Sequence, residues 1–526
     1  MRAILFCILA LVAAPTVADS TPCQGGAVFI DNNGNGARDS GEPGVPGARV
    51  SDGERIVVTD SAGVYQLATG SGRTTFLIKP AGFRVAARAD GLPDTWANVQ
   101  GATGPALRYG GVPVSPPTCK DFALIRQSEA PTPQLEVLVF GDPQPKSRLD
   151  VDYYKRDIVE PVRGKHRARL GISLGDIVSD DLSLYPALKA VDATLGIPWL
   201  HAPGNHDLDF DAGNDERSLD SFRHAFGPDT YAWEESLANF IVLDDVIYLP
   251  GESPAYIGGL REQQFAFLQA YLAGAPKDRL LVLSLHIPLF DATAGVETFR
   301  RADRERLFAL LQPFPNVLVL SAHSHNQQHF FHGRDTGWQG DKPLHEYNVG
   351  ATCGAFWSGV KDAAGIPVTT MSDGTPNGYA LLTVKPDAFD LRWFVARAAD
   401  DYQIQLYAPR VLRRGAYPAF AVYANVFMGA PDTKVEYRID DGQWKPMRRV
   451  LRADPSLVAE NLRDDLAATL RGYDRSPEAA LSTHLWRGPL ATDLSEGAHR
   501  VEVRAELAGF GVARANTEYR LGRAKR

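Results

Sequence analysis

Polar residues that could bind a cation follow five apolar segments in the middle of the chain. In chain order they lie in Gly141-Asp142-Pro143-Gln144, Gly175-Asp176, Gly204-Asn205-His206-Asp207, His286, and Ala322-His323-Ser324-His325. Carboxylates, an amide oxygen and imidazoles together suit divalent transition ions. A carboxylate has two oxygens and can bridge two ions, whereas each imidazole fills one position. The residue types therefore predict a site for a pair of divalent cations.

Around these residues, apolar runs alternate with helical patterns. The apolar runs cover residues 135–140, 170–174, 197–200, 240–243, 280–285 and 317–320, and the helical patterns cover residues 150–162, 182–195, 259–272 and 297–311. This alternation is typical of an α/β domain with buried sheets. We place the domain at residues 134–386. Because ligands bind at the carboxyl ends of strands in such sheets, we expect the polar residues to meet at one place.

Short strand-like runs separated by Gly, Pro, Asn and Asp residues flank this domain on both sides. The runs cover residues 27–30, 55–58, 64–67 and 75–78 on the N-terminal side, and residues 435–439 and 499–504, with a helical insert at 456–470, on the C-terminal side. They predict a small β-sandwich over residues 23–127 and a second sandwich, Ig-like or fibronectin-like, over residues 387–526. The expected fold class is an α/β core flanked by N- and C-terminal β-sandwich domains.

Together, the five strand-end motifs resemble those of the calcineurin-like metallophosphoesterase superfamily over residues 135–384. The resemblance implies a core of two β-sheets between helices and a binuclear site that holds Mn, Fe or Zn ions. The implied ligands are Asp142 and His325 for the first ion, Asp176 as the bridge, and Asn205, His286 and His323 for the second ion. His206 resembles the family's histidine that binds no metal, stabilises the transition state and protonates the leaving oxygen.

Two positions depart from the family pattern. Gln144 stands where the first motif commonly has a histidine, and an amide oxygen is a weaker ligand for transition ions than imidazole. Gln144 therefore either binds the first ion directly or supports it through a hydrogen bond. Ser179 replaces the carboxylate that commonly orients the non-ligand histidine. Either Asp180 or Asp181 takes this role or no residue does, and we assign it to Asp180.

The function expected from these residues is that of an exported two-metal phosphoesterase, which hydrolyses a mono- or diester of a small phosphorylated molecule. A hydroxide held between the two metals would attack phosphorus directly, which predicts inversion of configuration. The alternative is a catalytically weak or inactive surface or binding protein on the same fold, which Gln144 and the flanking domains favour. The chemistry does not separate monoester, diester and pyrophosphate substrates.

A turn-rich segment at residues 348–379 offers candidates for substrate binding. It contains Trp357 in a loop of small residues, followed by Asp373, Asn377 and Tyr379. Polar turn residues beside an aromatic ring could line a pocket and contact the leaving group. The alternative is a hairpin that packs on the edge of the sheet.

A second cation site is predicted near the N-terminus. Residues 31–42 fit the twelve-residue template of a calcium loop, with a glycine at its sixth position, Gly36. The oxygen donors would be Asp31, Asn33, Asn35, the carbonyl of Ala37, Asp39 and Glu42. Since strand-like segments flank the loop, it resembles the calcium loops of bacterial surface β-sandwich repeats. We expect a structural calcium ion, with a calcium-free Asx-rich turn as the alternative.

The first 18 residues have the pattern of a signal peptide, with Arg2, an apolar run and a small-residue cleavage site. This pattern predicts a periplasmic or secreted protein, and a hydrophobic N-terminal strand is the alternative. No later run has the length of a transmembrane helix. The formal net charge of −8, without basic runs, disfavours a nucleic-acid platform. The oligomeric state stays open.

Four cysteines bear on the compartment. Cys7 would leave with the signal peptide. A disulfide between Cys23 and Cys119 is plausible in an oxidising compartment. Cys353 would then remain as a buried, small apolar residue.

Overall fold

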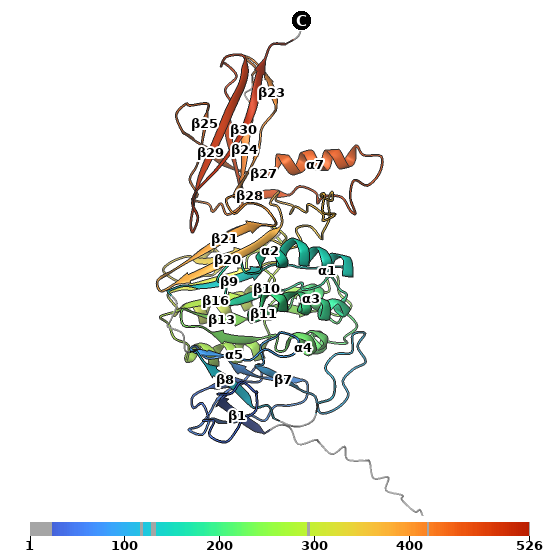
Figure 1. Cartoon of the computed structure of the whole chain (residues 1–526), viewed down its shortest axis with the longest axis vertical. Helices are drawn as coiled ribbons and strands as arrows, with labels where there is room; N and C mark the ends of the chain where they lie inside the picture. The colour runs from blue at the N-terminus through green and yellow to red at the C-terminus, as the bar shows by residue number, and fades with distance from the viewer. Residues whose placement is uncertain (1–23, 116–118, 128–132, 292–294, 418–419, 525–526) are drawn as a thin grey trace, which may run out of the picture.

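Two mixed β-sheets form the centre of the computed structural model, which describes residues 24–115, 119–127, 133–291, 295–417 and 420–524. The first sheet contains, in spatial order, β11 (Trp199–Ala202), β10 (Leu170–Leu174), β9 (Leu135–Phe140), β20 (Gly378–Lys385) and β21 (Ala388–Val395). The second contains β12 (Tyr231–Glu234), β13 (Ala238–Val242), β16 (Leu280–Ser284), β17 (Val317–Ser321), β19 (Leu344–Asn348) and β18 (Gln328–His332). Figure 1 shows them in the middle of the molecule.

Parallel pairing brings the strand ends together. Strands β9, β10 and β11 run parallel, as do β13, β16, β17 and β19, so the carboxyl ends within each set share an edge. Beyond the strands, Gly141 pairs with Ala351 in an isolated parallel bridge. This bridge joins the segment that follows β9 to the segment that follows β19. The apolar runs therefore place all the polar motifs at one end of the core.

Helices cover the two sheets. The first core helix, α1 (Arg148–Tyr154), continues through a π-helical turn (Lys155–Val159) into α2 (Glu160–Val162). The remaining α-helices of the core are α3 (Tyr185–Asp192), α4 (Asp220–Phe226), α5 (Glu262–Ala273) and α6 (Arg301–Leu311). The Tyr154 ring of α1 lies edge-on to Phe140 of β9, with 6.2 Å between centroids. On the other sheet, Phe308 of α6 packs against His332 of β18. The core is thus the expected α/β arrangement of two sheets with helices.

The predicted boundary at residues 386/387 is corrected by the pairing of β20 with β21. These strands form one hairpin, from Gly378 opposite Val395 to Lys385 opposite Ala388, and both belong to the first core sheet. The boundary was predicted there because apolar and polar residues begin to alternate again at about residue 388, as they would at the start of a new β-sandwich. An antiparallel hairpin at the edge of a sheet has the same alternation, because one of its faces is more exposed than the other.

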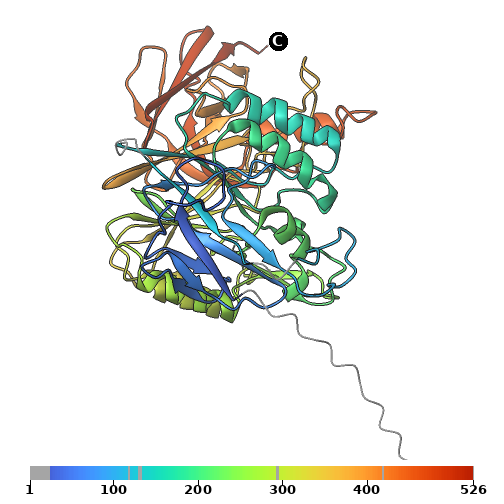
Figure 2. The ribbon, with the colours of Figure 1, turned by 60° about the horizontal axis from the view of Figure 1, so that its bottom comes forward.

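The N-terminal part forms two four-stranded sheets. Their strands are β4 (Val64–Gln66), β1 (Gly25–Ile30), β8 (Phe122–Arg126) and β6 (Phe83–Arg84) in one, and β3 (Ile56–Val58), β2 (Arg49–Ser51), β5 (Arg73–Ile78) and β7 (Trp96–Val99) in the other. Figure 2 brings these blue strands in front of the core. Lys79, which is fully buried, donates through Nζ to the carbonyl of Glu234 at 2.9 Å. Its side chain therefore anchors this part to the core.

The C-terminal part also has two sheets. They contain β22 (Ile404–Tyr407), β24 (Ala421–Val426), β28 (Leu481–Pro489) and β27 (Arg448–Ala453), and β23 (Val411–Arg413), β30 (Gly511–Gly522), β29 (Gly497–Leu507), β25 (Val435–Ile439) and β26 (Lys445–Pro446). The predicted helical insert is α7 (Pro455–Asp465). In the core, between β13 and α5, the strands β14 (Val246–Tyr248) and β15 (Tyr256–Gly258) form a small antiparallel ribbon. The two flanking parts are all-β apart from α7, as the sequence predicts.

Some expectations fall outside the described residues. The signal-peptide segment and Cys23 are among them, whereas Cys119 is disulfide-bonded and Cys353 is free and buried. Within the part of the chain that the structure describes, no helix combines the length and apolar character needed to cross a bilayer.

Candidate metal centre

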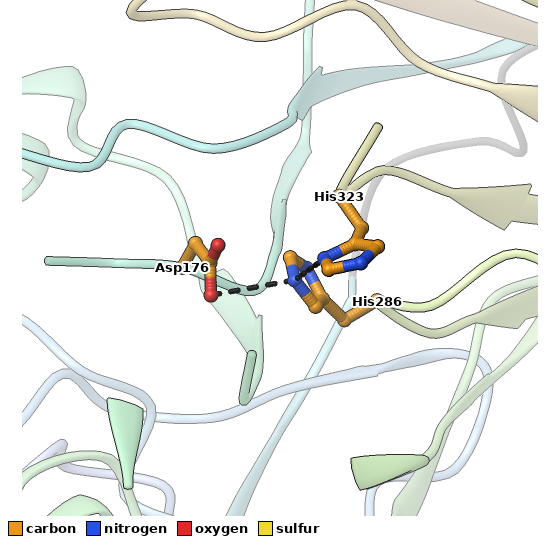
Figure 3. Close-up of side chains that lie close together, drawn as sticks. All are labelled: Asp176, His286 and His323. Carbon is orange, nitrogen blue, oxygen red and sulfur yellow. Dashed lines mark hydrogen bonds and ion pairs between the residues drawn. The ribbon is translucent and has the colours of Figure 1, made fainter. Parts of the chain in front are cut away.

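Three of the predicted ligands meet most closely. One ligand atom each from Asp176, His286 and His323 lies within 4.8 Å of the other two (Figure 3). Asp176 follows β10, whereas His286 and His323 follow β16 and β17 of the other sheet. Nε2 of His286 is 3.3 Å from Oδ1 of Asp176 and 3.1 Å from Nδ1 of His323. The site therefore spans the ends of both core sheets.

The other predicted ligands extend this group in two directions. Oδ1 of Asn205 lies 3.0 Å from Nε2 of His286, which adds the amide to the His286–His323 side. On the other side, Nε2 of His325 is 3.7 Å from Oδ1 of Asp142, and the backbone N–H of His323 lies 3.2 Å from both Asp142 oxygens. All six residues therefore converge, in the two groups that the resemblance implies.

Gln144 also lies inside the site. It is buried, and its Nε2 donates to Oδ2 of Asp176 at 3.2 Å, while its backbone N–H donates to the Asp176 carbonyl at 3.0 Å. The amide is thus close enough to act either as a ligand or as a hydrogen-bonding partner of Asp176. Both alternatives for Gln144 remain compatible with the geometry.

The backbone of the site is unusual. Ten described residues other than glycine have a positive φ, and eight of them lie in this site or at its edge. The eight are Asp142, Gln144, Asp176, Asp180, His323, His325, Phe356 and Trp357. A non-glycine residue in this conformation costs about 1–3 kcal/mol and persists only where its surroundings impose it. The strain of this fold is therefore concentrated at the predicted ligands and in one neighbouring loop.

Close packing of the loops explains the glycines of two Gly-Asx pairs, Gly175-Asp176 and Gly204-Asn205. A Cβ on Gly204 would lie 2.2 Å from the backbone nitrogen of Asp176, and one on Gly175 would lie 2.5 Å from Nδ1 of His286. Neither contact is sterically possible. Glycine at these two positions lets the ligand loops approach one another.

Two buried carboxylates outside the predicted set tie the loops together. Oδ2 of Asp207 accepts hydrogen bonds from the backbone N–H groups of Gly204 at 2.8 Å and Ile177 at 3.1 Å. Asp245 accepts from the backbone N–H of His286 at 3.1 Å. Sequence reasoning did not assign either residue, although Asp207 directly follows the Asn205-His206 motif.

The hydrogen bonds of the histidines fit a metal site. Nδ1 of His286 lies 2.8 Å from the carbonyl of Leu174, and Nδ1 of His325 lies 2.7 Å from the carbonyl of Gly354. A carbonyl can only accept, so each Nδ1 carries a proton, and in the neutral ring Nε2 keeps the lone pair that a metal ion would bind. Metal-binding histidines are commonly oriented in this way. The donor set therefore fits divalent cations.

Burial dominates the electrostatics of the site. It raises the pKa of Asp142 to about 8, and it lowers the pKa values of His323 to about 3 and of His325 to about 4. Burial also opposes protonation of His286, but the carboxylates of Asp176 and Asp142 outweigh it and raise that pKa to about 10. Two buried carboxylates thus draw positive charge into the site, which is the role that a cation would fill.

His206 lies at the edge of this group, beside Asp180. Its Nδ1 donates to Oδ1 of Asp180 at 2.7 Å, and its backbone N–H donates to Oδ1 of Asp176 at 2.9 Å. Burial lowers the pKa of His206, but its hydrogen bond to Asp180 and the charge of Asp176 outweigh this effect and raise the pKa to about 8. Asp181 instead accepts from the backbone N–H of Ser183. Of the two candidates, Asp180 therefore contacts His206.

A residue of the N-terminal part reaches the same position. The hydroxyl of Tyr109 donates to the carbonyl of Asp180 at 3.0 Å, across 71 positions of the chain. Nothing in the sequence pattern around Tyr109 indicates this contact. The flanking domain therefore touches the segment that orients His206.

The four residues expected to bind substrate are all buried. Trp357 is 1% exposed and donates through Nε1 to the Pro143 carbonyl at 2.9 Å, and the Tyr379 hydroxyl is 2.8 Å from Nε2 of His166. Asn377 donates to Oδ2 of Asp157 at 2.8 Å, and Asp373 binds Nε2 of His484 in β28 at 3.0 Å. Because their polar atoms are engaged inside the protein, the structure gives a substrate-binding role for them no support. Asp373 instead joins the core to the C-terminal sheets.

The exposed aromatic residue of this loop is the neighbour of Trp357. Phe356 is 41% exposed, and its ring lies 4.7 Å from that of His325. Sequence reasoning considered the tryptophan as the aromatic residue of this small-residue loop and missed the phenylalanine. A bulky residue next to Gly354 and Ala355 was the only available signal.

Comparison with known protein families covers most of the chain. The family model described as calcineurin-like phosphoesterase matches residues 135–327, which include every predicted ligand of the binuclear site. Models for the N-terminal and C-terminal parts of calcineurin-like phosphoesterases match residues 32–107 and 346–509. The chain thus matches all three parts in their expected order. No curated protein matches it.

Solved structures similar to this chain include two that are phosphatases by title and one titled as PhoD. A dimetal phosphatase from Danio rerio is 16% identical, with 50% of this chain and 96% of that chain covered and a TM-score of 0.35. PhoD is 12% identical, with 79% of this chain and 92% of that chain covered and a TM-score of 0.38. A purple acid phosphatase from yellow lupin (Lupinus luteus) seeds is 13% identical, with 68% of each chain covered and a TM-score of 0.38. At these values the assignment rests on the three family models, and the chain belongs to the calcineurin-like metallophosphoesterase superfamily as a metal-dependent phosphoric ester hydrolase.

Proposed function

We propose that this protein is an exported two-metal phosphoesterase that hydrolyses a mono- or diester of a small phosphorylated molecule. One observation carries the proposal: Asp142, Asp176, Asn205, His286, His323 and His325, from five separate strand ends, converge within hydrogen-bonding or ion-pairing distances. A decayed site on the same fold would be expected to lose ligands first. The nearly complete set, with Gln144 as the departure, therefore favours an enzyme over an inactive binding protein.

The donor groups divide naturally between two ions. Asp142 and His325 would hold the first, Asn205, His286 and His323 the second, and Asp176 both, with Gln144 at or beside the first. Mn, Fe and Zn ions all suit this mixture of oxygen and nitrogen donors. Such ions would supply positive charge for the phosphoryl oxygens and a water of lowered pKa.

His206 is the proton donor in this proposal. Its Nδ1–H donates a hydrogen bond to the carboxylate of Asp180 at 2.7 Å. This leaves Nε2 for the substrate. From there Nε2–H can donate its proton to the departing ester oxygen. No step uses a covalent bond between protein and phosphorus. We therefore expect inversion of configuration at phosphorus, measured with a chiral phosphate ester.

Two observations favour export. The first 18 residues match the three-part pattern of a signal peptide. Cys119 is disulfide-bonded, and disulfides persist in oxidising compartments such as the periplasm and the extracellular space. We propose a periplasmic or secreted location on these grounds.

Metal removal tests the enzymatic proposal. We expect the purified protein to hydrolyse para-nitrophenyl phosphate or bis-para-nitrophenyl phosphate with Mn²⁺, to lose all measurable turnover in EDTA, and to regain it when excess Mn²⁺ is added. A panel of phosphorylated metabolites then ranks substrates by kcat/KM. No turnover of any ester with Mn²⁺, Fe²⁺ or Zn²⁺ would instead favour the inactive binding protein.

The predicted calcium loop is compact in the structure. Asp31 and Glu42, its first and last residues, are nearly buried, and Glu42 accepts from the backbone N–H groups of Asn32 at 2.8 Å and Asp39 at 3.0 Å. The side-chain amides of Asn33 and Asn35 both donate to Oδ2 of Asp39 at 2.7 Å, and these bonds lower the pKa of Asp39. The predicted donors thus already face one another. We propose that the loop holds a structural Ca²⁺.

Calcium should stabilise the N-terminal sheets. Extracellular calcium modules bind with Kd values of about 10⁻⁴–10⁻³ M, so ~10 mM Ca²⁺ would stabilise the folded state by about 1.5–3 kcal/mol. We expect a rise of a few degrees in the unfolding temperature of wild type, none in Glu42→Gln, and an unchanged rise in Asp176→Asn, whose loop is intact. Equal rises in wild type and Glu42→Gln would assign calcium to another site.

A further inference from the structure

Phe356 occupies an uncommon position for a large apolar residue. Its ring is 41% exposed and lies 4.7 Å from the imidazole of His325, tilted by 36°. The ammonium group of Lys146, an exposed residue after the first ligand motif, lies 4.7 Å from the centroid of the same ring. An aromatic face and a cation therefore stand together beside a predicted ligand of the first metal.

The loop around Phe356 is held by the site itself. The backbone N–H of Cys353 donates to the Asp142 carbonyl at 3.1 Å, and the Gly354 carbonyl accepts from Nδ1 of His325 at 2.7 Å. Ala355 donates to Oγ1 of Thr369 at 3.0 Å. The position of the Phe356 ring relative to the metal ligands is thus determined by several independent contacts.

Trp357 explains why Phe356 stays outside. The indole is buried, bonded to the Pro143 carbonyl and packed against Tyr153, with 6.4 Å between ring centroids. Both residues have left-handed backbone conformations, with φ of 56° at Phe356 and 57° at Trp357. Glycine would adopt this turn without strain, and a polar residue would suit the exposure. The strained backbone of this phenylalanine, beside the predicted ligands, points to a function for its ring.

We propose that Phe356 and Lys146 form the leaving-group subsite of the enzyme, and that its substrates are phosphate esters of a planar aromatic or heteroaromatic group that bears a negative charge. The inference rests on the proposed function, because the phosphoryl group must bind at the metal ligands for its substituent to reach Phe356. The substituent packs against the exposed part of the Phe356 ring. Lys146 pairs with the charge on the substituent.

Binding of phosphonates tests this subsite without any dependence on leaving-group reactivity. On the Mn²⁺-loaded protein, we expect calorimetry and competitive inhibition to show phenylphosphonate binding about tenfold more tightly than cyclohexylphosphonate. A carboxylate on the phenyl ring should tighten binding further. Phe356→Leu should remove the preference for the planar ring, Phe356→Tyr should keep it, and Lys146→Met should remove only the gain from the carboxylate.

Phe331 provides a matched control. It is 44% exposed and stacks on His345 with 4.6 Å between centroids, but it lies on β18 and contacts none of the predicted ligands that are named above. Phe331→Leu should leave every phosphonate affinity unchanged. Equal affinities of the two phosphonates for wild type, or a preference that survives in Phe356→Leu, would overturn the subsite while aryl phosphate turnover still supports the proposed function. Absence of both phosphonate binding and turnover would overturn the proposed function itself.

Discussion

The Asp176→Asn variant should lose at least about 10³-fold in kcat/KM for any phosphate ester that the wild-type protein hydrolyses. Asp176 lies between the two groups of ligands, since its oxygens are 3.3 Å from Nε2 of His286 and 3.2 Å from Nε2 of Gln144. Asparagine keeps the shape of the side chain but removes the charge and one of the two acceptor oxygens. If Asp176 bridges two ions, the loss of its charge or of one oxygen weakens the binding of both ions.

Thermal unfolding separates this effect from a loss of folding. Mn²⁺ should raise the unfolding temperature of wild type, since a ligand that binds only the folded state stabilises it, and the rise should be largely absent in Asp176→Asn. Asp192→Asn is the matched control, because Asp192 is also buried, bonds only to the hydroxyl of Tyr154 at 2.6 Å, and has a pKa raised to about 7 by burial. Full activity in Asp176→Asn would contradict its role as the bridge.

The strand ends were the predictable part of the site. Residues 135–140 and 170–174 are predominantly apolar runs, interrupted only by Glu136 and Ser173 among polar residues, and β9 and β10 begin and end at the same residues. A strand buried on both faces needs such a run, and the first charged residue after it marks the point where the chain leaves the core. Parallel pairing then brings Asp142 and Asp176 together without further information.

Side-chain direction within a turn was not predictable. Phe356 and Trp357 are adjacent aromatic residues, and nothing in their order indicates that the larger one is buried and the smaller one exposed. The left-handed backbone at both positions decides the outcome, and that conformation depends on contacts of Cys353 and Gly354 with residues far away in the chain. The choice between Asp180 and Asp181 has the same origin, since φ is 63° at Asp180.

Contacts between separate parts of the chain were likewise hidden. Tyr109 reaches the Asp180 carbonyl from a loop of the N-terminal part, and Asp373 binds His484 in the C-terminal sheets. Such contacts depend on how whole sheets dock, which local periodicity does not encode. The sequence therefore indicated no contribution of the flanking parts to the active site, although Tyr109 of the N-terminal part contacts the segment that orients His206.

The second large effect is expected at His206. His206→Asn should lower kcat by about 10²–10⁴-fold for an alkyl phosphate, whose leaving oxygen needs a proton, and by far less for para-nitrophenyl phosphate, whose leaving group departs as a stable anion. The measurement is kcat across aryl and alkyl phosphates of rising leaving-group pKa. The variant should show a steeper dependence than wild type, and Asp180→Asn should show a smaller change in the same direction.

The geometry makes this dependence informative about the imidazole alone. The backbone N–H of His206, which donates to Oδ1 of Asp176 at 2.9 Å, is unchanged in His206→Asn, so the ligand loop keeps its main tie to the metal centre. His224→Asn, which replaces an exposed histidine on α4, is the control and should retain wild-type kinetics for every ester. A uniform loss across all leaving groups in His206→Asn would show that the side chain stabilises charge at phosphorus and does not deliver the proton. A loss that grows with leaving-group pKa assigns the proton transfer to His206, because the backbone contact of this loop to Asp176 is retained in the variant.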